Sequence, residues 1–133
     1  MKTILFACVH NAGRSQMAAA LFNRLADPAQ ARAISAGTDP ARRVHPEVQA
    51  ALAELGIELG DRRPRKLTPE LARSADLLVT MGCGDRCPDV PGLERLDWAL
   101  EDPKGQPPER VRAIRAAVEE RVRALLAARA WSR

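Results

Sequence analysis

The feature that most constrains the fold of this chain is a regular alternation between short apolar runs and helical patterns. The first run, residues 2–8, has the compact, β-branched character of a strand that is buried on both faces of a parallel sheet. Apolar residues then recur at helical spacing from Ser15 until the Asp27-Pro28 break. The alternation continues, with strands expected at 32–36, 77–81 and 93–98, and with helices expected from Pro46 to a Gly56 cap, from Pro69 to about Arg73 after a Thr68 cap, and beyond Pro108.

This order of elements predicts an α/β fold with parallel strands. Strands that alternate with helices are joined by crossovers that pack the helices on the faces of the sheet, so we expect a three-layer sandwich. In such folds, ligands bind at the carboxyl ends of the strands. Four segments fall there: Cys8, Gly37, Gly82 with Cys83, and the stretch after Trp98. We therefore expect the functional site where these loops converge.

Composition narrows the class of protein. With 133 residues, of which 46% are apolar and 29% charged, the chain is expected to form one domain over residues 1–133. The first apolar run is too short for a membrane span or a signal-peptide core, so we expect a cytoplasmic protein that does not contact the membrane. Three cysteines in a reducing compartment indicate redox or nucleophilic chemistry rather than a disulfide framework.

The net charge of +4 comes almost wholly from arginine and favours anionic partners. Nucleic acid is disfavoured as a partner, because the basic residues are scattered and aromatic residues make up only 3% of the chain. We interpret two basic clusters as solvated loop surface, namely Arg42-Arg43 and Arg62-Arg63 with Arg65-Lys66.

The sharpest motif is a cysteine and an arginine that are separated by five residues, between the first strand and the first helix. Five residues can wrap a ring of inward-pointing backbone N–H groups at a helix N-terminus, and such a ring fits a tetrahedral oxyanion. Arg14 would bind two oxygens of that anion, and the same positive field would favour Cys8 as a thiolate nucleophile. The spacing alone also permits a small buried Cys8 at a strand end. The predicted oxyanion-binding residues are Val9, His10, Asn11, Ala12, Gly13, Arg14 and Ser15.

Residues within this loop carry specific expectations. Asn11 and Gly13 are the residues best able to adopt a positive φ. Ser15 is expected to donate a hydrogen bond to the Cys8 sulfur or to cap the helix N-terminus, and the two roles are compatible. His10 is expected to have a structural role in the loop.

The other two cysteines, Cys83 and Cys87, lie together after the third expected strand. A zinc site is disfavoured, because C-x3-C with one distant cysteine and only two histidines gives no standard ligand set. Two core thiols are disfavoured in a loop rich in glycine and charge. If the loop is helical, residues four apart have Cα atoms about 6 Å apart, which a disulfide tolerates. Sequential thiol exchange fits best, and we predict neither a metal nor another cofactor.

Four separated motifs resemble, in order, the arsenate reductases built on the low-molecular-weight protein tyrosine phosphatase fold, and the resemblance covers nearly the whole chain. It is greatest to the thioredoxin-coupled branch, because the two extra cysteines are present. The resemblance implies a four-stranded parallel sheet flanked by helices, arsenate as substrate with phosphate or sulfate as mimics, and thioredoxin as reductant, with glutaredoxin or a low-molecular-weight thiol left open. The motifs are LFACVHNAGRSQMAAAL at 5–21, ISAGT at 34–38, LVTMGC at 78–83, and Asp97-Trp98 through Glu101-Asp102-Pro103.

The resemblance also implies an order of thiol chemistry. Cys8 attacks arsenic and displaces a hydroxide, Cys83 attacks Cys8 and releases arsenite, and Cys87 attacks Cys83 and carries the disulfide to the surface for thioredoxin. Some thioredoxin-coupled relatives have six residues between their last two cysteines, whereas this chain has three. The order in which Cys83 and Cys87 react therefore stays open, whereas Cys8 is assigned as the nucleophile.

A proton donor is needed on the leaving side of arsenic, and Asp97, Glu101 and Asp102 are the candidate acids. The resemblance assigns the role to Asp102, which Pro103 would keep extended toward the ring. From the residues alone, Asp102 is a turn or cap carboxylate. Asp97-Trp98 is interpreted as strand-end packing.

Some relatives bind potassium beneath the ring. In this chain Ala19 stands where the resemblance places a glutamate, and Arg65 or Lys66 stands near the place of an aspartate. The resemblance therefore implies that a basic side chain, rather than a cation, lies near Asn11 and Ser35.

Two other functions are alternatives. A low-molecular-weight phosphatase would act on phosphotyrosine or small phosphomonoesters through Cys8, Arg14 and Asp102 alone. Gly13 replaces the second loop cysteine that is common in those phosphatases, and Asp102 is followed by Pro103 and Lys104 without the aromatic residue usual near their acid, so the reductase is favoured. Weak phosphatase turnover is compatible with it, because arsenate and phosphate share shape and charge. A phosphate-binding regulator without catalysis is disfavoured by the intact nucleophile, arginine and acid.

Overall fold

The structure is a computed structural model and describes residues 1–82 and 90–133. At its centre is a four-stranded sheet with the order β2-β1-β3-β4, in which each neighbouring pair is parallel. The predicted parallel sheet is therefore confirmed. The strands are β1 (Lys2–Cys8), β2 (Ala31–Gly37), β3 (Leu77–Thr80) and β4 (Glu94–Asp97).

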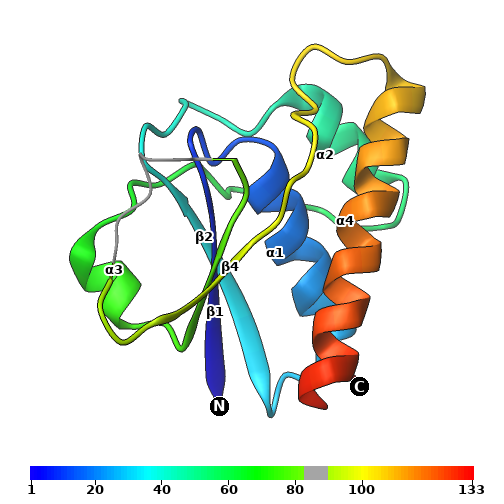
Figure 1. Ribbon diagram of the computed structural model, residues 1–133. Coiled ribbons are helices and arrows are strands. Elements are labelled where there is room, and N and C mark those ends of the chain that lie inside the picture. Colours follow the sequence, from blue (N-terminus) through cyan, green and yellow to red (C-terminus); the bar gives the residue numbers. More distant parts are fainter. Residues whose placement is uncertain (83–89) are drawn as a thin grey trace.

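Helices cover both faces of this sheet, which confirms the predicted three-layer sandwich (Figure 1). On one face, α1, α2 and α4 pack over Ile4 and Phe6 of β1 in the larger core cluster. On the other face, α3 and its flanking segments pack over Leu5 in a smaller cluster. No helix in the described ranges has both the length and the apolar composition that a membrane crossing requires. The helices are α1 (Arg14–Leu25), α2 (Pro46–Ala53), α3 (Pro69–Arg73) and α4 (Pro108–Arg129).

Local sequence signals explain where the helices begin and end. Three of the four begin with proline, whose missing N–H leaves no helical hydrogen bond unmade at that position. The hydroxyl oxygen of Thr68 accepts a hydrogen bond from the N–H of Leu71 at 3.1 Å, as expected of the cap. After α2, Gly56 has a φ of +76° and the N–H of Ile57 bonds to the carbonyl of Leu52, so the predicted glycine closes the last turn.

The strand register brings the predicted loops together at one edge. Cys8, at the end of β1, pairs with Gly37 at the end of β2, and β3 ends beside β1 at Thr80. The ring of Phe6 lies 5.5 Å from the ring of Trp98, measured between centroids, and Trp98 is buried. The predicted strand-end packing of Trp98 is confirmed, and it fastens the segment after β4 to the edge that carries Cys8.

Glu54, which follows α2, ties that helix to α4. Its carboxylate accepts hydrogen bonds from Arg112 and Arg115 at 2.7 and 2.8 Å, and these bonds lower the pKa of Glu54 from 4.5 to about 2. Because the pKa of Glu54 is lower in the folded than in the unfolded protein, its ionised carboxylate stabilises the fold at pH values above 4.5. This contribution is lost as the pH falls from 4.5 toward 2. We expect Glu54→Gln to lower the thermal unfolding midpoint by roughly 1–3 °C at neutral pH and to have almost no effect at about pH 2.

Circular dichroism melts of both proteins at the two pH values would test this expectation. Glu120→Gln is the matched control, because Glu120 is exposed on α4 and has no ion-pair partner among the residues of the described ranges. An equal loss of stability for Glu54→Gln at both pH values would contradict the assignment.

Candidate active site

A five-residue loop, 9–13, connects β1 to α1. Cys8 is the last residue of β1 and is only 3% exposed, and the helix begins at Arg14. Asn11 has a φ of +50°, as expected. Gly13 has a φ of −132°, so it does not use the positive φ that glycine allows. Glycine is needed here for lack of space, because a Cβ atom at Gly13 would lie 3.0 Å from Cγ of Pro103.

The loop backbone is held from outside by the segment that follows β2. Carbonyls of the loop accept hydrogen bonds from that segment, whereas the N–H groups of residues 9–14 have no acceptor in the described part of the chain. Because the carbonyls are directed outward, the amides are left on the inner side, next to the N-terminus of α1. Free, convergent N–H groups at a helix N-terminus form a site for an oxyanion. The bonds join the N–H groups of Thr38, Asp39, Ala41 and His45 to the carbonyl oxygens of Cys8, Val9, His10 and Ala12, respectively.

A buried hydrogen-bond chain leads from this loop to the sulfur of Cys8. Oδ1 of Asn11 accepts hydrogen bonds from Nε2 of Gln16 at 3.1 Å and from the backbone N–H of Arg65 at 3.0 Å. These two donors fix the amide orientation, so Nδ2 of Asn11 donates to Oγ of Ser15 at 2.8 Å. Ser15 accepts that bond, and its hydroxyl hydrogen is left for the sulfur of Cys8, 2.8 Å away.

Ser15 is thus a donor to the sulfur and not the N-cap of α1. The N-cap is Gly13, and no side chain caps the helix there, while Ser15 is the second helical residue. Of its two predicted roles, the contact with Cys8 is present and the capping role is wrong. A hydroxyl donor in this place is suited to stabilise negative charge on sulfur.

Asn11 is expected to contribute strongly to stability, because its side chain is fully buried and bonds to both Gln16 and Ser15. Asn11→Ala removes the side-chain bonds to Gln16, to Ser15 and to the backbone N–H of Arg65 and places alanine at positive φ. We therefore expect it to lower the free energy of unfolding by about 3 kcal/mol. Asn11→Gly removes the same side-chain hydrogen bonds, but glycine adopts the positive φ of this position without strain. Its free energy of unfolding should therefore be about 1 kcal/mol higher than that of Asn11→Ala. Urea unfolding measures both. Equal stabilities of Asn11→Gly and the parent would contradict a structural role for the side chain.

Arg14 lies between the loop and the segment that follows β4. Its Nη1 donates to the carbonyl of Leu100 at 2.9 Å, and its Nη2 lies 3.9 Å from Oδ2 of Asp102. Gly82 approaches the same guanidinium so closely that a Cβ atom there would lie 2.5 Å from Nη1. Only 15% of the Arg14 side chain is exposed, so its positive charge is sheltered where three segments meet.

Two of the three candidate acids are engaged elsewhere. Asp97 accepts hydrogen bonds from Thr80 and Arg95, which lower the pKa of its carboxyl group. Glu101 forms an ion pair with Arg110, whose hydrogen bond lowers the pKa of Glu101. A carboxyl group that is held in its ionised form is a poor proton donor.

Asp102 is the candidate acid that faces Arg14. Its side chain is 49% exposed, and its Oδ1 accepts the backbone N–H of Lys104 at 3.0 Å. The next residue, Pro103, is buried against Gly13 of the oxyanion loop. This contact places the Asp102 carboxylate beside the loop that carries the thiol.

Two predicted site residues, Cys83 and Cys87, lie outside the described residues. Gly82, the last described residue before them, has a φ of +90° and lies against Arg14. In the described ranges, no group of three or more histidine, cysteine, aspartate or glutamate side chains could hold a metal ion.

A basic side chain lies beneath the loop, near Asn11. Arg65 donates its backbone N–H to Asn11 and its Nε to the carbonyl oxygen of Ser35 at 3.1 Å. The ammonium group of Lys66 bonds instead to the carbonyl of Thr38. Of the two basic residues named from the sequence, Arg65 is therefore the one beside Ser35.

Other residues support the site in ways that the motif does not indicate. Gln16 orients Asn11 from within α1, and only its polar character within a buried helix face could have signalled this role. Gly37 lies so close to the loop that a Cβ atom would be 2.5 Å from the carbonyl oxygen of Val9. Nδ1 of His10 bonds to the carbonyl of Asp39 at 2.9 Å, which is the structural role expected of it.

Comparison with known proteins places this site among related ones. The chain matches the model of the low molecular weight phosphotyrosine protein phosphatase family over residues 3–131. A putative arsenate reductase from Halobacterium salinarum is 42% identical over 123 residues, which cover 88% of this chain and 85% of that protein. A glutaredoxin arsenate reductase from Synechocystis sp. is 34% identical over 130 residues, which cover 96% and 98%. A solved thioredoxin-dependent arsenate reductase from Corynebacterium glutamicum has a TM-score of 0.83 and 40% identity, over 96% of this chain but 61% of that one.

Proposed function

The chain belongs to the low molecular weight phosphotyrosine protein phosphatase family, and we propose that within this family it reduces arsenate to arsenite. The observation that carries the proposal is that the loop next to the buried sulfur of Cys8 has N–H groups without an acceptor in the described residues, which joins an oxyanion site to a nucleophile. The relatives named as arsenate reductases support the choice of oxyanion. Because the ring itself accepts phosphate and arsenate alike, the choice of reaction depends on the two additional cysteines, which supply electrons.

In the proposed first step, Cys8 attacks arsenic and one arsenate oxygen leaves. The N–H groups of residues 9–14 and the guanidinium of Arg14 hold the remaining oxygens and stabilise the charge that develops on them. Ser15 donates to the attacking sulfur. Asp102 protonates the departing oxygen, which leaves as water, and Cys8 is joined to arsenic.

In the proposed second step, arsenic gains two electrons. The sulfur of Cys83 attacks the sulfur of Cys8, the sulfur–arsenic bond breaks, and its electron pair stays on arsenic, which leaves as arsenite. Cys87 then attacks Cys83 and frees Cys8 as a thiolate. The Cys83–Cys87 disulfide takes two electrons from an external dithiol, which returns the protein to its starting state.

We propose thioredoxin as that dithiol, in keeping with the thioredoxin-dependent relative of known structure. The relative named glutaredoxin arsenate reductase supplies the competing choice. Steady-state assays with thioredoxin, thioredoxin reductase and NADPH, compared with glutaredoxin and glutathione, distinguish the two. We expect turnover with the thioredoxin system, and turnover with glutaredoxin alone would overturn the choice of reductant while leaving arsenate reduction in place.

Asp102→Asn should lower turnover by about 10²–10³-fold with little change in oxyanion affinity, because an amide cannot donate the proton and removes no ring contact. Steady-state rates and sulfate dissociation constants measured side by side test this split. Asp97→Asn is the control, since Asp97 is held by Thr80 and Arg95 and should affect turnover little. If Asp97→Asn is the damaging change and Asp102→Asn is not, the assignment of the acid is wrong.

A phosphatase activity needs only Cys8, Arg14 and Asp102, and so weak hydrolysis of p-nitrophenyl phosphate is compatible with the proposal. The two activities differ in what they require of sulfur, because water hydrolyses a phosphocysteine whereas arsenic must take electrons from a second thiol. If the protein hydrolyses p-nitrophenyl phosphate efficiently and forms no arsenite under reducing conditions, its function is that of a phosphatase.

A further inference from the structure

A hollow with a basic lining lies next to the loop of residues 9–13, because Gln16 and Arg65, which bond to Asn11 of that loop, form part of its wall. It has a volume of about 300 Å³ and opens between α1, β2 and the segment 62–65. Its polar lining consists of Gln16, Ser35 and the arginines at positions 62, 63 and 65, and the rest is small or apolar. The chemistry proposed for Cys8 uses none of the three guanidinium groups. The hollow is large enough for a tetrahedral oxyanion with its bound water.

The charge of this hollow is uncompensated. No acidic side chain lines it, and neither Arg62 nor Arg63 has an ion-pair partner within residues 1–82 and 90–133. Arg65 is held against the wall by the bond from its Nε to the carbonyl of Ser35. By contrast, several arginines elsewhere are paired with glutamate, as Arg112 is.

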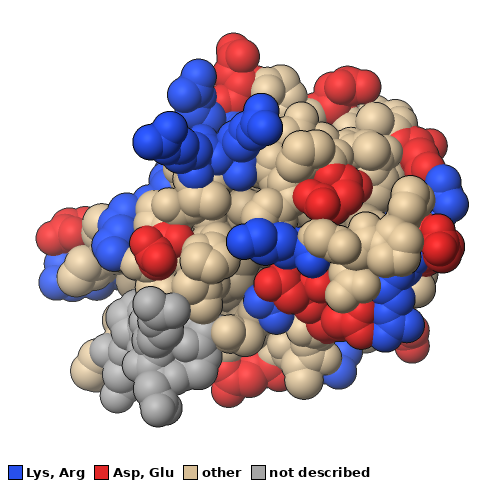
Figure 2. All heavy atoms as spheres, turned by 90° about the horizontal axis from the view of Figure 1, so that it is seen from above, with Lys and Arg blue, Asp and Glu red and all other residues tan. Residues whose placement is uncertain are grey.

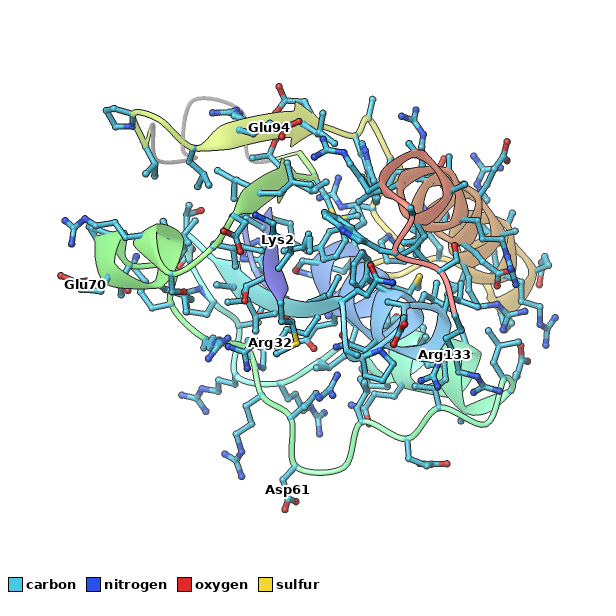
Figure 3. The ribbon with its side chains drawn as sticks, turned by 90° about the horizontal axis from the view of Figure 1, so that it is seen from below. Lys2, Arg32, Asp61, Glu70, Glu94 and Arg133 are labelled. Carbon is cyan, nitrogen blue, oxygen red and sulfur yellow. The ribbon has the colours of Figure 1, made fainter. Side chains whose placement is uncertain are left out.

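An adjoining hollow extends the same basic surface. It has a volume of about 320 Å³, shares Arg62 and Arg63, and adds Arg42 and Arg43. Asp61 is the acidic residue in its lining, and its side chain points away from the body of the molecule in Figure 3. Figure 2 shows one group of Lys and Arg side chains at the top of the view, with an acidic side chain beside it, and further basic side chains among acidic ones elsewhere on this face. Unpaired guanidinium groups in this number attract anions and repel cations.

We propose that the hollow lined by Arg62, Arg63 and Arg65 is a second oxyanion site, for an anion of the phosphate or sulfate class, separate from the ring around Cys8. Guanidinium groups bind such anions through paired N–H donors, and three of them can surround a tetrahedral anion from one side. Gln16 also lines the hollow, while its Nε2 donates to the backbone oxygen and to Oδ1 of Asn11.

The second site is connected to the nucleophile through hydrogen bonds that the structure contains. Gln16 and the backbone N–H of Arg65 both donate to Oδ1 of Asn11, Asn11 donates to Ser15, and Ser15 reaches Cys8. An anion that pulls on Gln16 or Arg65 therefore acts on the groups that set the orientation of Ser15. The site thus provides a route by which a bound anion adjusts the nucleophile without entering the ring.

Sulfate binding to the full chain tests this proposal, by equilibrium dialysis at constant ionic strength maintained with chloride. We expect two sulfate ions per chain, and one after Cys8 has been alkylated with iodoacetamide to fill the ring. In the alkylated protein, the double variant Arg62→Gln/Arg63→Gln should weaken the remaining site tenfold or more. The matched control Arg42→Gln/Arg43→Gln removes the same charge from the adjoining hollow and should change the affinity less than twofold. Phosphate and pyrophosphate in place of sulfate show whether one or two phosphoryl groups are preferred.

A second measurement uses the unmodified protein. In nuclear magnetic resonance titrations with sulfate, the side-chain amide signals of Gln16 and Asn11 should shift with a separate affinity from the amides of residues 9–13, and this second response should disappear in Arg62→Gln/Arg63→Gln. A single sulfate per chain that is lost on alkylation, or equal weakening by the two double variants, would overturn the proposal. Neither measurement depends on arsenate reduction, so the outcome is independent of the proposed reaction.

Discussion

Cys8→Ser should lower arsenate turnover by about 10⁴-fold or more and abolish any phosphatase activity. The buried sulfur lies directly before the loop, 2.8 Å from Oγ of Ser15, and a serine hydroxyl in the same place is a far weaker nucleophile that cannot form a disulfide. The substitution hardly changes volume, so the fold should be retained. Arsenite formation is measured in the thioredoxin-coupled assay, with the circular dichroism spectrum as a check on folding.

Oxyanion binding supplies the control for this variant. Its ring N–H groups and Arg14 are unaltered, so Cys8→Ser should bind sulfate at the loop with an affinity close to that of the parent. Detectable arsenite production by a folded, sulfate-binding Cys8→Ser protein would remove Cys8 from the chemistry.

Replacing either resolving cysteine should abolish thioredoxin-coupled arsenate turnover while any phosphatase activity is kept, and the trapped states should differ. In Cys87→Ser, one equivalent of arsenate should still be reduced, and the protein should stall with Cys8 joined to Cys83. In Cys83→Ser that disulfide cannot form. Peptide mapping under non-reducing conditions distinguishes the two states.

The short C-x3-C spacing allows one other outcome for the Cys83→Ser variant. If Cys87 reaches Cys8 directly in the Cys83→Ser variant, a Cys8–Cys87 disulfide will accumulate after one turnover, and the order of the two resolving thiols is reversed. If both variants turn over arsenate like the parent with thioredoxin as the only reductant, the three-thiol relay is not the mechanism.

Elements with a local cause were predictable from the sequence. The Thr68 cap, the helix starts at Pro46 and Pro108, and the glycine closure at Gly56 each depend on one or two residues and their own backbone. The strands β1 and β3 were predictable because burial on both faces demands unbroken apolar runs, whereas β4 is mostly exposed and carries no such run. The parallel sheet and its convergent loops follow from these elements and their order.

Residues whose roles depend on distant neighbours were not predictable. Gly13 is required by the approach of Pro103, ninety positions along the chain, rather than by its own φ. The function of Gln16 depends on Asn11 being turned by the N–H of Arg65, and the sequence gives no sign of that bond. Arg14 also bonds to the carbonyl of Leu100, which only the packing of the segment after β4 brings within reach.

The proposed function is tested most directly by a single turnover without any external reductant. Fully reduced protein is mixed with excess arsenate, arsenite is quantified, and the free thiols are counted after denaturation. We predict one arsenite per chain, with the free thiols falling from the three cysteines of the sequence to one. If three thiols remain and no arsenite forms, while p-nitrophenyl phosphate is hydrolysed by the same sample, then the protein is a phosphatase and not an arsenate reductase.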